Sequence, residues 1–139
     1  ILCGSNEFIE GAHKWRKMVG GGMRQAGVLA AAGLVALDNM VERLADDHSN
    51  AKRLAEGLAN IQGISVDPTS IQTNIVTFEI SESAGNADDV INELANEGVL
   101  VTYPGQQSLR MVTHRHISAS DIDEALSRVA KVMTQMNSK

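Results

Sequence analysis

Residues 74–80 of the chain, NIVTFEI, mark the point at which its hydrophobic pattern changes from a helical to an alternating period. Val76, Phe78 and Ile80 occupy every second position of this stretch, and such alternation is typical of a strand with one buried face. The residues before it, from about position 23 to position 63, instead repeat their apolar side chains at helical spacing. The stretch therefore predicts a strand over residues 74–80 in a fold that combines helices with a sheet.

Three further segments predict short strands, at residues 64–66, 99–102 and 108–113. The sequence YPGQQ, residues 103–107, predicts a turn between the last two of them. A helix is expected over residues 87–97 and ends at Gly98, and a last helix begins at Ser118 with Asp121 as a capping-box partner. This order predicts an α+β fold in which helices pack on one face of a small, mostly antiparallel sheet.

The first part of the chain is expected to be helical. Residues 1–4 resemble the end of an apolar strand, and Ser5 or Asn6 can cap a helix over residues 7–18. A long buried helix is predicted from Met23 to Gly63, bending near residues 46–48, because its small apolar residues indicate burial on several sides. Because the chain does not begin with Met, we expect residues 1–47 to end a larger domain and residues 48–139 to form a small α+β domain.

Composition excludes several classes of function. The 139 residues are 43% hydrophobic and carry a formal net charge of −5, whereas nonspecific nucleic-acid binding requires a broad basic face. No apolar run is long enough to span a bilayer. Cys3 cannot form a disulfide within the chain, which fits a reducing, cytoplasmic compartment, and we expect it to be a small buried apolar residue. We therefore expect no nucleic-acid partner and no membrane.

The basic residues are concentrated around a glycine run in residues 14–25, KWRKMVGGGMRQ. Glycine lets backbone N–H groups approach an anion closely, and Lys17 and Arg24 can donate charge-assisted hydrogen bonds to a phosphate. The start of the helix that follows would add partial positive charge. From these residues alone, an anion site and an ordinary hinge with solvated cations are both open.

The longer stretch HKWRKMVGGGMRQAGVLAAAGL, residues 13–34, closely resembles the corresponding part of low-specificity L-threonine aldolases. These enzymes belong to the pyridoxal phosphate (PLP) enzymes of fold type I. The resemblance continues through ERLADDHSNAKRLAEGL, TNIVTFEI and LRMVTHRHIS, and so covers essentially the whole chain. It implies a homotetramer in which each subunit has a large PLP-binding domain and a smaller C-terminal α+β domain. The implied reaction cleaves threonine or allo-threonine to glycine and acetaldehyde.

The same resemblance assigns roles to particular residues. It implies that the lysine that binds PLP lies upstream of Ile1, in a missing N-terminal part of the same enzyme, so that this chain alone has no catalytic residue and is inactive. It places Lys17 and Arg24 near the PLP phosphate, at or across a subunit interface. The intervening glycines would contribute to that cofactor site through their backbone: Gly20, Gly21 and Gly22.

Arg110, in SLRMVTH, matches the arginine that binds the carboxylate of the amino-acid substrate in this family. The planar fork of a guanidinium can donate two parallel hydrogen bonds to one carboxylate. Without the resemblance, a strand arginine that faces water is the simpler interpretation. His114 and His116 share a strand face, but no cysteine or carboxylate nearby completes a ligand set, so we expect no metal site.

Two other interpretations of the function stay open. The chain could belong to another PLP-dependent β-eliminating lyase, although the GGGMRQ run favours an aldolase. It could also be a noncatalytic α+β module for binding or assembly, because fold alone does not fix function. The run of charges Glu42, Arg43, Asp46 and Asp47 is interpreted as a solvated helix face.

Overall fold

The computed structural model describes residues 2–105 and 107–138, and the chain divides into two compact units. The first unit comprises Ile1–Val41 and the second comprises Glu42–Lys139. The division therefore falls between Val41 and Glu42, whereas the sequence places a boundary between residues 47 and 48. No helix in the described part of the chain is both long and apolar enough to cross a membrane.

The first unit contains two helices, α1 (Asn6–Met18) and α2 (Gly27–Asn39). The α1 helix begins as predicted, because the Ser5 hydroxyl accepts a hydrogen bond from the Phe8 N–H at 3.3 Å. Neither helix contains a buried residue. Residues 2–4 have no regular secondary structure, Ile1 lies outside the described residues, and Cys3 is exposed. The predicted strand over residues 2–4 and the predicted burial of Cys3 are therefore wrong: these residues pair with no sheet of the chain.

The single long helix predicted from Met23 to Gly63 is two helices. The α2 helix starts only at Gly27, after Gln25 takes a positive φ of 51°, and α3 runs over Leu44–Leu58. The interruption lies at residues 40–43, so the bend predicted near residues 46–48 is wrong. The predicted burial of the α2 face is also wrong for this chain, because side chains such as Leu34 are 61% exposed.

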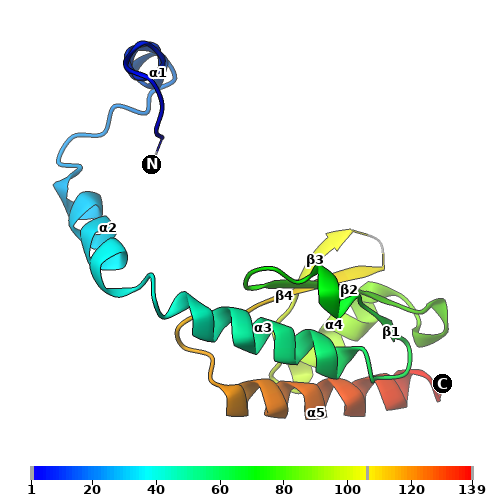
Figure 1. Ribbon diagram of the computed structural model, residues 1–139. Coiled ribbons are helices and arrows are strands. Elements are labelled where there is room, and N and C mark those ends of the chain that lie inside the picture. Colours follow the sequence, from blue (N-terminus) through cyan, green and yellow to red (C-terminus); the bar gives the residue numbers. More distant parts are fainter. Residues whose placement is uncertain (1, 106, 139) are drawn as a thin grey trace. The chain divides into compact units, whose positions relative to one another are not determined.

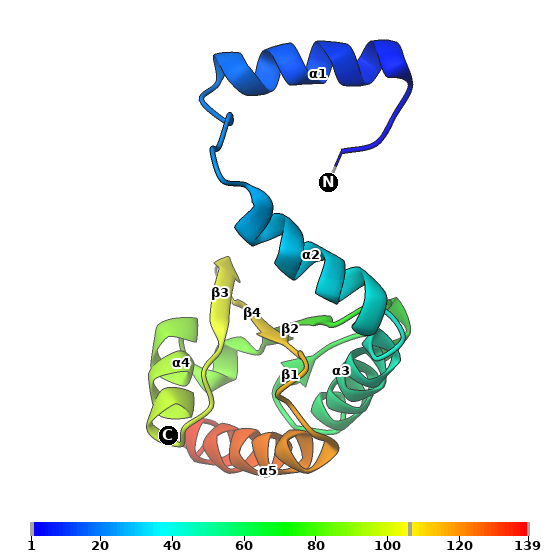
Figure 2. The same cartoon turned by 90° about the vertical axis from the view of Figure 1, so that its left-hand side faces the viewer.

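The second unit is built around a four-stranded antiparallel sheet with the order β1-β2-β4-β3, as Figure 2 shows. The strands are β1 (Ile64–Ser65), β2 (Ile75–Ile80), β3 (Thr102–Gly105) and β4 (Ser108–Val112). The third strand begins at the last residue of the predicted segment 99–102, so most of the predicted turn 103–107 is strand instead. Gln106, within that turn, lies outside the described residues. The α+β fold with an antiparallel sheet is confirmed.

Three helices cover one face of this sheet, as predicted: α3, α4 (Ala87–Asn96) and α5 (Ala119–Met136) (Figure 1). Short 3-10 turns at Pro68–Ser70 and Glu82–Ala84 complete the connections. The predicted capping box of α5 is present, because Ser118 Oγ accepts from the Asp121 N–H while Asp121 accepts from the Ser118 N–H.

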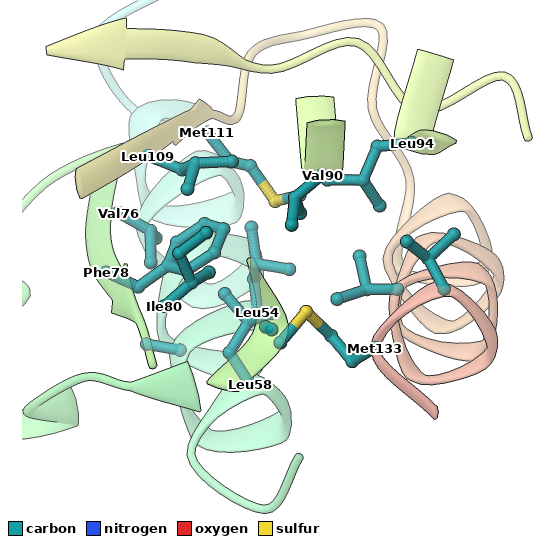
Figure 3. Packing of buried hydrophobic residues seen from close by; sticks show 14 of the residues in the cluster. Leu54, Leu58, Val76, Phe78, Ile80, Val90, Leu94, Leu109, Met111 and Met133 are labelled. Atoms are coloured by element: carbon teal, nitrogen blue, oxygen red, sulfur yellow. The ribbon is translucent and has the colours of Figure 1, made fainter. Parts of the chain in front are cut away.

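The alternation of β2 decides which way the sheet faces. Val76, Phe78 and Ile80 are buried, whereas the residues between them are exposed. Figure 3 shows these side chains, with Leu109 and Met111 of β4, pointing toward apolar side chains of the helices. The helix residues shown there include Leu54, Leu58, Val90, Leu94 and Met133. The opposite, outer face of β2 and β4 is left to solvent within this chain, and Arg110 lies on it.

Candidate functional site

The glycine run forms the C-terminal cap of α1. Gly20 has a left-handed φ of 80°, and its N–H donates to the Lys17 carbonyl at 3.3 Å. The Gly21 N–H donates to the Arg16 carbonyl at 2.8 Å. These two bonds make a Schellman motif, in which a glycine takes a conformation that side chains disfavour and so closes the last turn. The first two glycines therefore have a local structural reason that the sequence prediction of an anion-facing loop did not include.

The third glycine lies under the side chain of a candidate site residue. A Cβ atom at Gly22 would meet Lys17 Cδ at 3.4 Å and Lys17 Nζ at 3.7 Å. The lysine ammonium thus folds back over the glycine run instead of extending along the helix axis. The N–H groups of Gly20 and Gly21 are occupied by helix carbonyls, whereas among the described residues no backbone hydrogen bond of this turn uses the N–H of Gly22.

Lys17 and Arg24 are both exposed cations at this turn. Among the described residues, neither forms an ion pair with a carboxylate. Their charges are therefore available to an external anion, which is the property that a phosphate site requires. Trp15, on the same helix, is also exposed and does not pack in a core of this chain.

Arg110 lies in the middle of β4 on the outer face of the sheet. It stands opposite Thr77 of β2 on one side and Thr102 of β3 on the other. Its Nε donates to Thr102 Oγ1 at 3.1 Å, and the Thr102 hydroxyl donates to the Arg110 carbonyl at 3.3 Å. Thr102 thus orients the Arg110 guanidinium through Nε only. The two Nη groups have no carboxylate partner among the described residues, so the fork can receive a carboxylate from outside.

The neighbours of Arg110 on the outer face are two threonines, two apolar residues, one serine and one acidic residue. Thr77 and Thr102 flank it across the strands. The exposed pair Ile75 and Val112 forms the row on one side, and Glu79 and Ser108 form the row on the other side. Arg110 itself is exposed, so a small carboxylate can reach its guanidinium from solvent.

A buried polar cluster lies where β4 ends. Asp47 is only 4% exposed, and its carboxylate accepts two hydrogen bonds from the Arg43 guanidinium, at 2.5 and 3.0 Å. This pairing lowers the pKa of Asp47, against the opposing effect of burial, and nearby His114 and His48 add smaller favourable contributions. The interpretation of these charges as a solvated helix face is therefore wrong for Arg43 and Asp47. Their i, i+4 spacing was the signal available in the sequence.

The two histidines after β4 contact each other. His114 Nδ1 accepts a hydrogen bond from the His116 N–H at 3.3 Å, and the ring centroids are 5.9 Å apart. Within residues 2–105 and 107–138, no group of three or more histidine, cysteine, aspartate or glutamate side chains is placed to hold a metal ion. Both histidines lie in the turn that leads from β4 to α5.

The candidate residues are distributed over both units. Lys17, Arg24 and the glycines belong to the first unit, and Arg110 belongs to the second. The two sets share one chemical property, which is unpaired positive charge directed to solvent and available to anions.

The comparison with known families gives one family match. The family model described as beta-eliminating lyase matches residues 1–81. The chain therefore belongs to the beta-eliminating lyase family.

Several relatives of the chain have names that are more specific than the family description. Low-specificity L-threonine aldolase 1 of Arabidopsis thaliana is 38% identical over 98% of the chain. Probable low-specificity L-threonine aldolase 2 of the same plant is 41% identical over 95%. The low specificity L-threonine aldolase of Escherichia coli strain K12 is 38% identical over 89%. The chain spans 38% of the length of each Arabidopsis relative and 35% of the bacterial one.

Solved structures show the same fold at lower identity. A mutant of C-DES with glycine covalently linked to its PLP cofactor matches with a TM-score of 0.62 and 21% identity, over 76% of this chain and 28% of that one. Plasmodium falciparum ornithine delta-aminotransferase matches with a TM-score of 0.56 and 14% identity, over 70% of this chain and 26% of that one. These matches concern architecture alone.

Proposed function

We propose that the chain is the C-terminal part of a PLP-dependent L-threonine aldolase, which cleaves β-hydroxy-α-amino acids to glycine and an aldehyde. The observation that carries this proposal is 38–41% identity to two plant low-specificity L-threonine aldolases over nearly all of its length. Because the chain spans little more than a third of these relatives, the remaining part of the enzyme has to supply the lysine that binds the cofactor. The isolated chain is then expected to be inactive.

The first unit would contribute to cofactor binding. PLP, when bound, supplies an electron sink for cleavage of the Cα–Cβ bond. Its phosphate is a dianion, and the unpaired charges of Lys17 and Arg24 beside the glycine turn fit such a group. Gly20 and Gly21 would act by closing α1, and Gly22 by leaving room for the Lys17 side chain and offering its N–H.

A cofactor-affinity measurement tests this role. In the complete enzyme, Lys17→Gln or Arg24→Gln should weaken PLP binding by about 10- to 150-fold, since a hydrogen bond to a charged group contributes about 1.5–3 kcal/mol. Binding is followed by titrating PLP into the apoenzyme and recording the cofactor absorbance. Lys14→Gln removes a cation from the same helix and is the matched control. Equal effects of all three variants would point to a general loss of charge and contradict the assignment.

The second unit would hold the substrate. Arg110 is proposed to bind the α-carboxylate of threonine through its two Nη groups while Thr102 fixes the Nε side. This arrangement orients the amino acid without taking part in bond cleavage. The exposed aliphatic pair Ile75 and Val112 lies in the next row and would exclude water from that side.

Steady-state kinetics test the role of Arg110. Arg110→Ala in the complete enzyme should raise KM for L-threonine by about 10- to 150-fold, because a charged, bidentate contact is lost. Arg53→Ala removes another exposed arginine of the same unit and should leave KM unchanged. An unchanged KM in Arg110→Ala would contradict the proposed role of Arg110 in binding the substrate carboxylate.

Assembly and location belong to the same proposal. The exposed apolar side chains of α1 and α2 suit burial against the rest of the enzyme and against other subunits of a homotetramer. In that assembly, residues 1–47 would complete a large domain and residues 48–139 would form the small one. The proposed compartment is the cytoplasm, consistent with one exposed thiol. Light scattering on the complete enzyme measures its subunit number.

Another lyase of the same family is the second candidate, because the matching family model is named for β-elimination. The two activities differ in their products. An aldolase releases glycine and an aldehyde from L-threonine, whereas a β-eliminating enzyme releases a 2-oxo acid and ammonia from an amino acid with a leaving group on Cβ. Assays of the complete enzyme with L-threonine and with L-cysteine distinguish them.

A further inference from the structure

The two polar residues that are buried in the described part of the chain are bonded to each other. Asp47 is 4% exposed and Thr113 is 1% exposed. The Thr113 hydroxyl donates to the Asp47 main-chain carbonyl at 2.7 Å. Asp47 lies in the first turns of α3, and Thr113 directly follows β4. This contact thus joins a helix start to a strand end that is 66 residues away in sequence.

The side-chain carboxylate of Asp47 is also hydrogen-bonded, in addition to its main-chain carbonyl. Arg43 holds both carboxylate oxygens with a two-pronged contact, and Arg43 immediately precedes α3. Asp47 is buried and Arg43 is half-buried, so desolvation offsets part of their attraction. The pair joins the residue before α3 to the first turns of that helix and so fixes the geometry at its start.

Thr113 is also tied to the neighbouring strand. Its N–H donates to the Asn74 carbonyl at 2.9 Å, and the Asn74 side-chain amide donates to the Thr113 carbonyl at 2.8 Å. Asn74 directly precedes β2, the strand that pairs with β4 along its length. Every hydrogen-bonding group of Thr113 is thus committed, and the end of β4 is held from two sides.

Arg110 lies within β4, three residues before Thr113, and α3 begins directly after the point where the chain enters the second unit. We propose that Arg43, Asp47 and Thr113 are positioning residues, which hold the strand that carries Arg110 against the first turn of α3. This inference rests on the proposed role of Arg110 in binding the substrate carboxylate. A two-pronged contact between a guanidinium and a carboxylate is sensitive to small displacements of the arginine, because both hydrogen bonds depend on the orientation of the guanidinium plane.

The chain offers a matched control on the same helix. Arg53 of α3 also grips a carboxylate with two nitrogens, at 2.8 and 2.7 Å from Asp123 of α5. That pair is exposed, and it joins α3 to α5. Removing it tests the general effect of losing an Arg–Asp pair from α3.

The test uses the complete enzyme with its cofactor, well below its unfolding temperature. Thr113→Val deletes the hydroxyl and keeps the side-chain volume, and it should raise KM for L-threonine about threefold to tenfold with a smaller change in kcat. Thr113→Ser restores the hydroxyl and should return KM to near the wild-type value. Asp47→Asn should raise KM in the same way, whereas Asp123→Asn should leave KM unchanged. The unfolding temperature of each variant is measured alongside.

A double variant shows whether the effect passes through Arg110. In an Arg110→Ala background, Thr113→Val should add little to the increase in KM, because the residue that it positions is already absent. Variants of Thr113 and Asp47 that lower only the unfolding temperature, with KM unchanged, would overturn the inference. If Thr113→Val does not fold, Asp47→Asn decides by the same measurements.

The two proposals fail separately. An unchanged KM in Arg110→Ala would refute the carboxylate role and this inference with it. An increase in KM for Arg110→Ala without any increase for Thr113→Val and Asp47→Asn would refute the positioning role alone.

Discussion

The two units of the chain differ in where their apolar side chains lie. In the second unit, α3, α4 and α5 bury their apolar faces against the sheet and one another, as Figure 3 shows for the centre of the core. In the first unit, α1 and α2 bury nothing, although α2 is made almost entirely of apolar residues. A helix that is apolar on all sides is normally buried on all sides. The second unit thus contains its own core, whereas neither helix of the first unit buries a residue within this chain.

The two units therefore differ in what stabilises them. The second unit gains the free energy of apolar burial within the chain. The first unit has only the local terms of its helices, its Ser5 cap and the glycine closure of α1, and isolated helices of this length are marginal in water. Substitutions of the same type should therefore have unequal effects in the two units.

The largest inequality is expected for leucine truncation. Leu58→Ala removes a side chain that is fully buried and should cost about 2–5 kcal/mol in the free energy of unfolding. Leu34→Ala, at an exposed position of α2, should change it by less than about 0.5 kcal/mol. Urea unfolding of the 139-residue chain, followed by circular dichroism, measures both. Comparable costs would show that α2 shares the core and would remove the contrast.

Helical glycines should respond with opposite signs. A Cβ at Gly57 would overlap the end of the Leu126 side chain, with Leu126 Cδ2 at 2.7 Å, so Gly57→Ala should destabilise the second unit by about 1–3 kcal/mol.

Gly33→Ala in α2 is the matched change, because no atom lies within 4 Å of its Cβ position. Alanine favours helix over glycine by about 0.8–1 kcal/mol, so this variant should increase helix content without lowering the unfolding midpoint. Thermal unfolding measures the change in the unfolding midpoint of each variant, and the helical circular dichroism signal measures the change in helix content. Destabilisation by Gly33→Ala would indicate that α2 is packed closely within the chain.

Helix caps extend the comparison to a smaller effect. Ser118→Ala breaks the capping box of α5 and should cost about 1 kcal/mol of global stability. Ser5→Ala removes the corresponding hydroxyl from α1 and should lower only the helix content of the first unit. Measuring the unfolding midpoint and the helical signal together distinguishes these outcomes. An equal loss of global stability in Ser5→Ala would mean that the two units unfold as one.

The smallest predicted effect is on the pH dependence of stability. Hydrogen bonds from Ser118 lower the pKa of Asp121, and its folded value therefore lies below its unfolded one. The stabilisation is present above the unfolded pKa of about 4 and is lost as the pH falls through the folded value. Asp121→Asn should flatten the decline of the unfolding midpoint below about pH 4. An unaltered pH profile would show that this carboxylate contributes no acid sensitivity.

Much of the second unit could be predicted because its signals are local. The alternation in β2, the Ser118–Asp121 capping pair and the amphipathic pattern of α5 each need only a few neighbouring residues. The third strand was placed too early, since residues 99–101 are as apolar as a strand but pair with none. Pairing depends on a partner strand, which a single segment does not specify.

Some features of the candidate site were visible in the sequence, and others were not. Positive charge around the glycine run and the arginine in β4 were visible in the sequence, and the resemblance to a known family gave them their proposed roles. The Schellman closure of α1 was not expected, although a glycine after a helix is its usual signal. The contact of Thr113 with Asp47 was missed because only folding brings these two residues together, whereas the i, i+4 spacing of Arg43 and Asp47 was available in the sequence.

The sequence by itself determined the period of each segment, its caps and the family to which the chain belongs, because these depend on residues that are close in the chain. Only the tertiary structure decided which charges are buried and which remain free. Arg43 and Arg110 are the same residue type, and one is paired with a buried aspartate while the other keeps its fork open. Asp47 is buried because folding packs the start of α3 against the end of β4, whereas Arg110 lies on the exposed outer face of the sheet, and neither placement follows from the residues next to it in sequence.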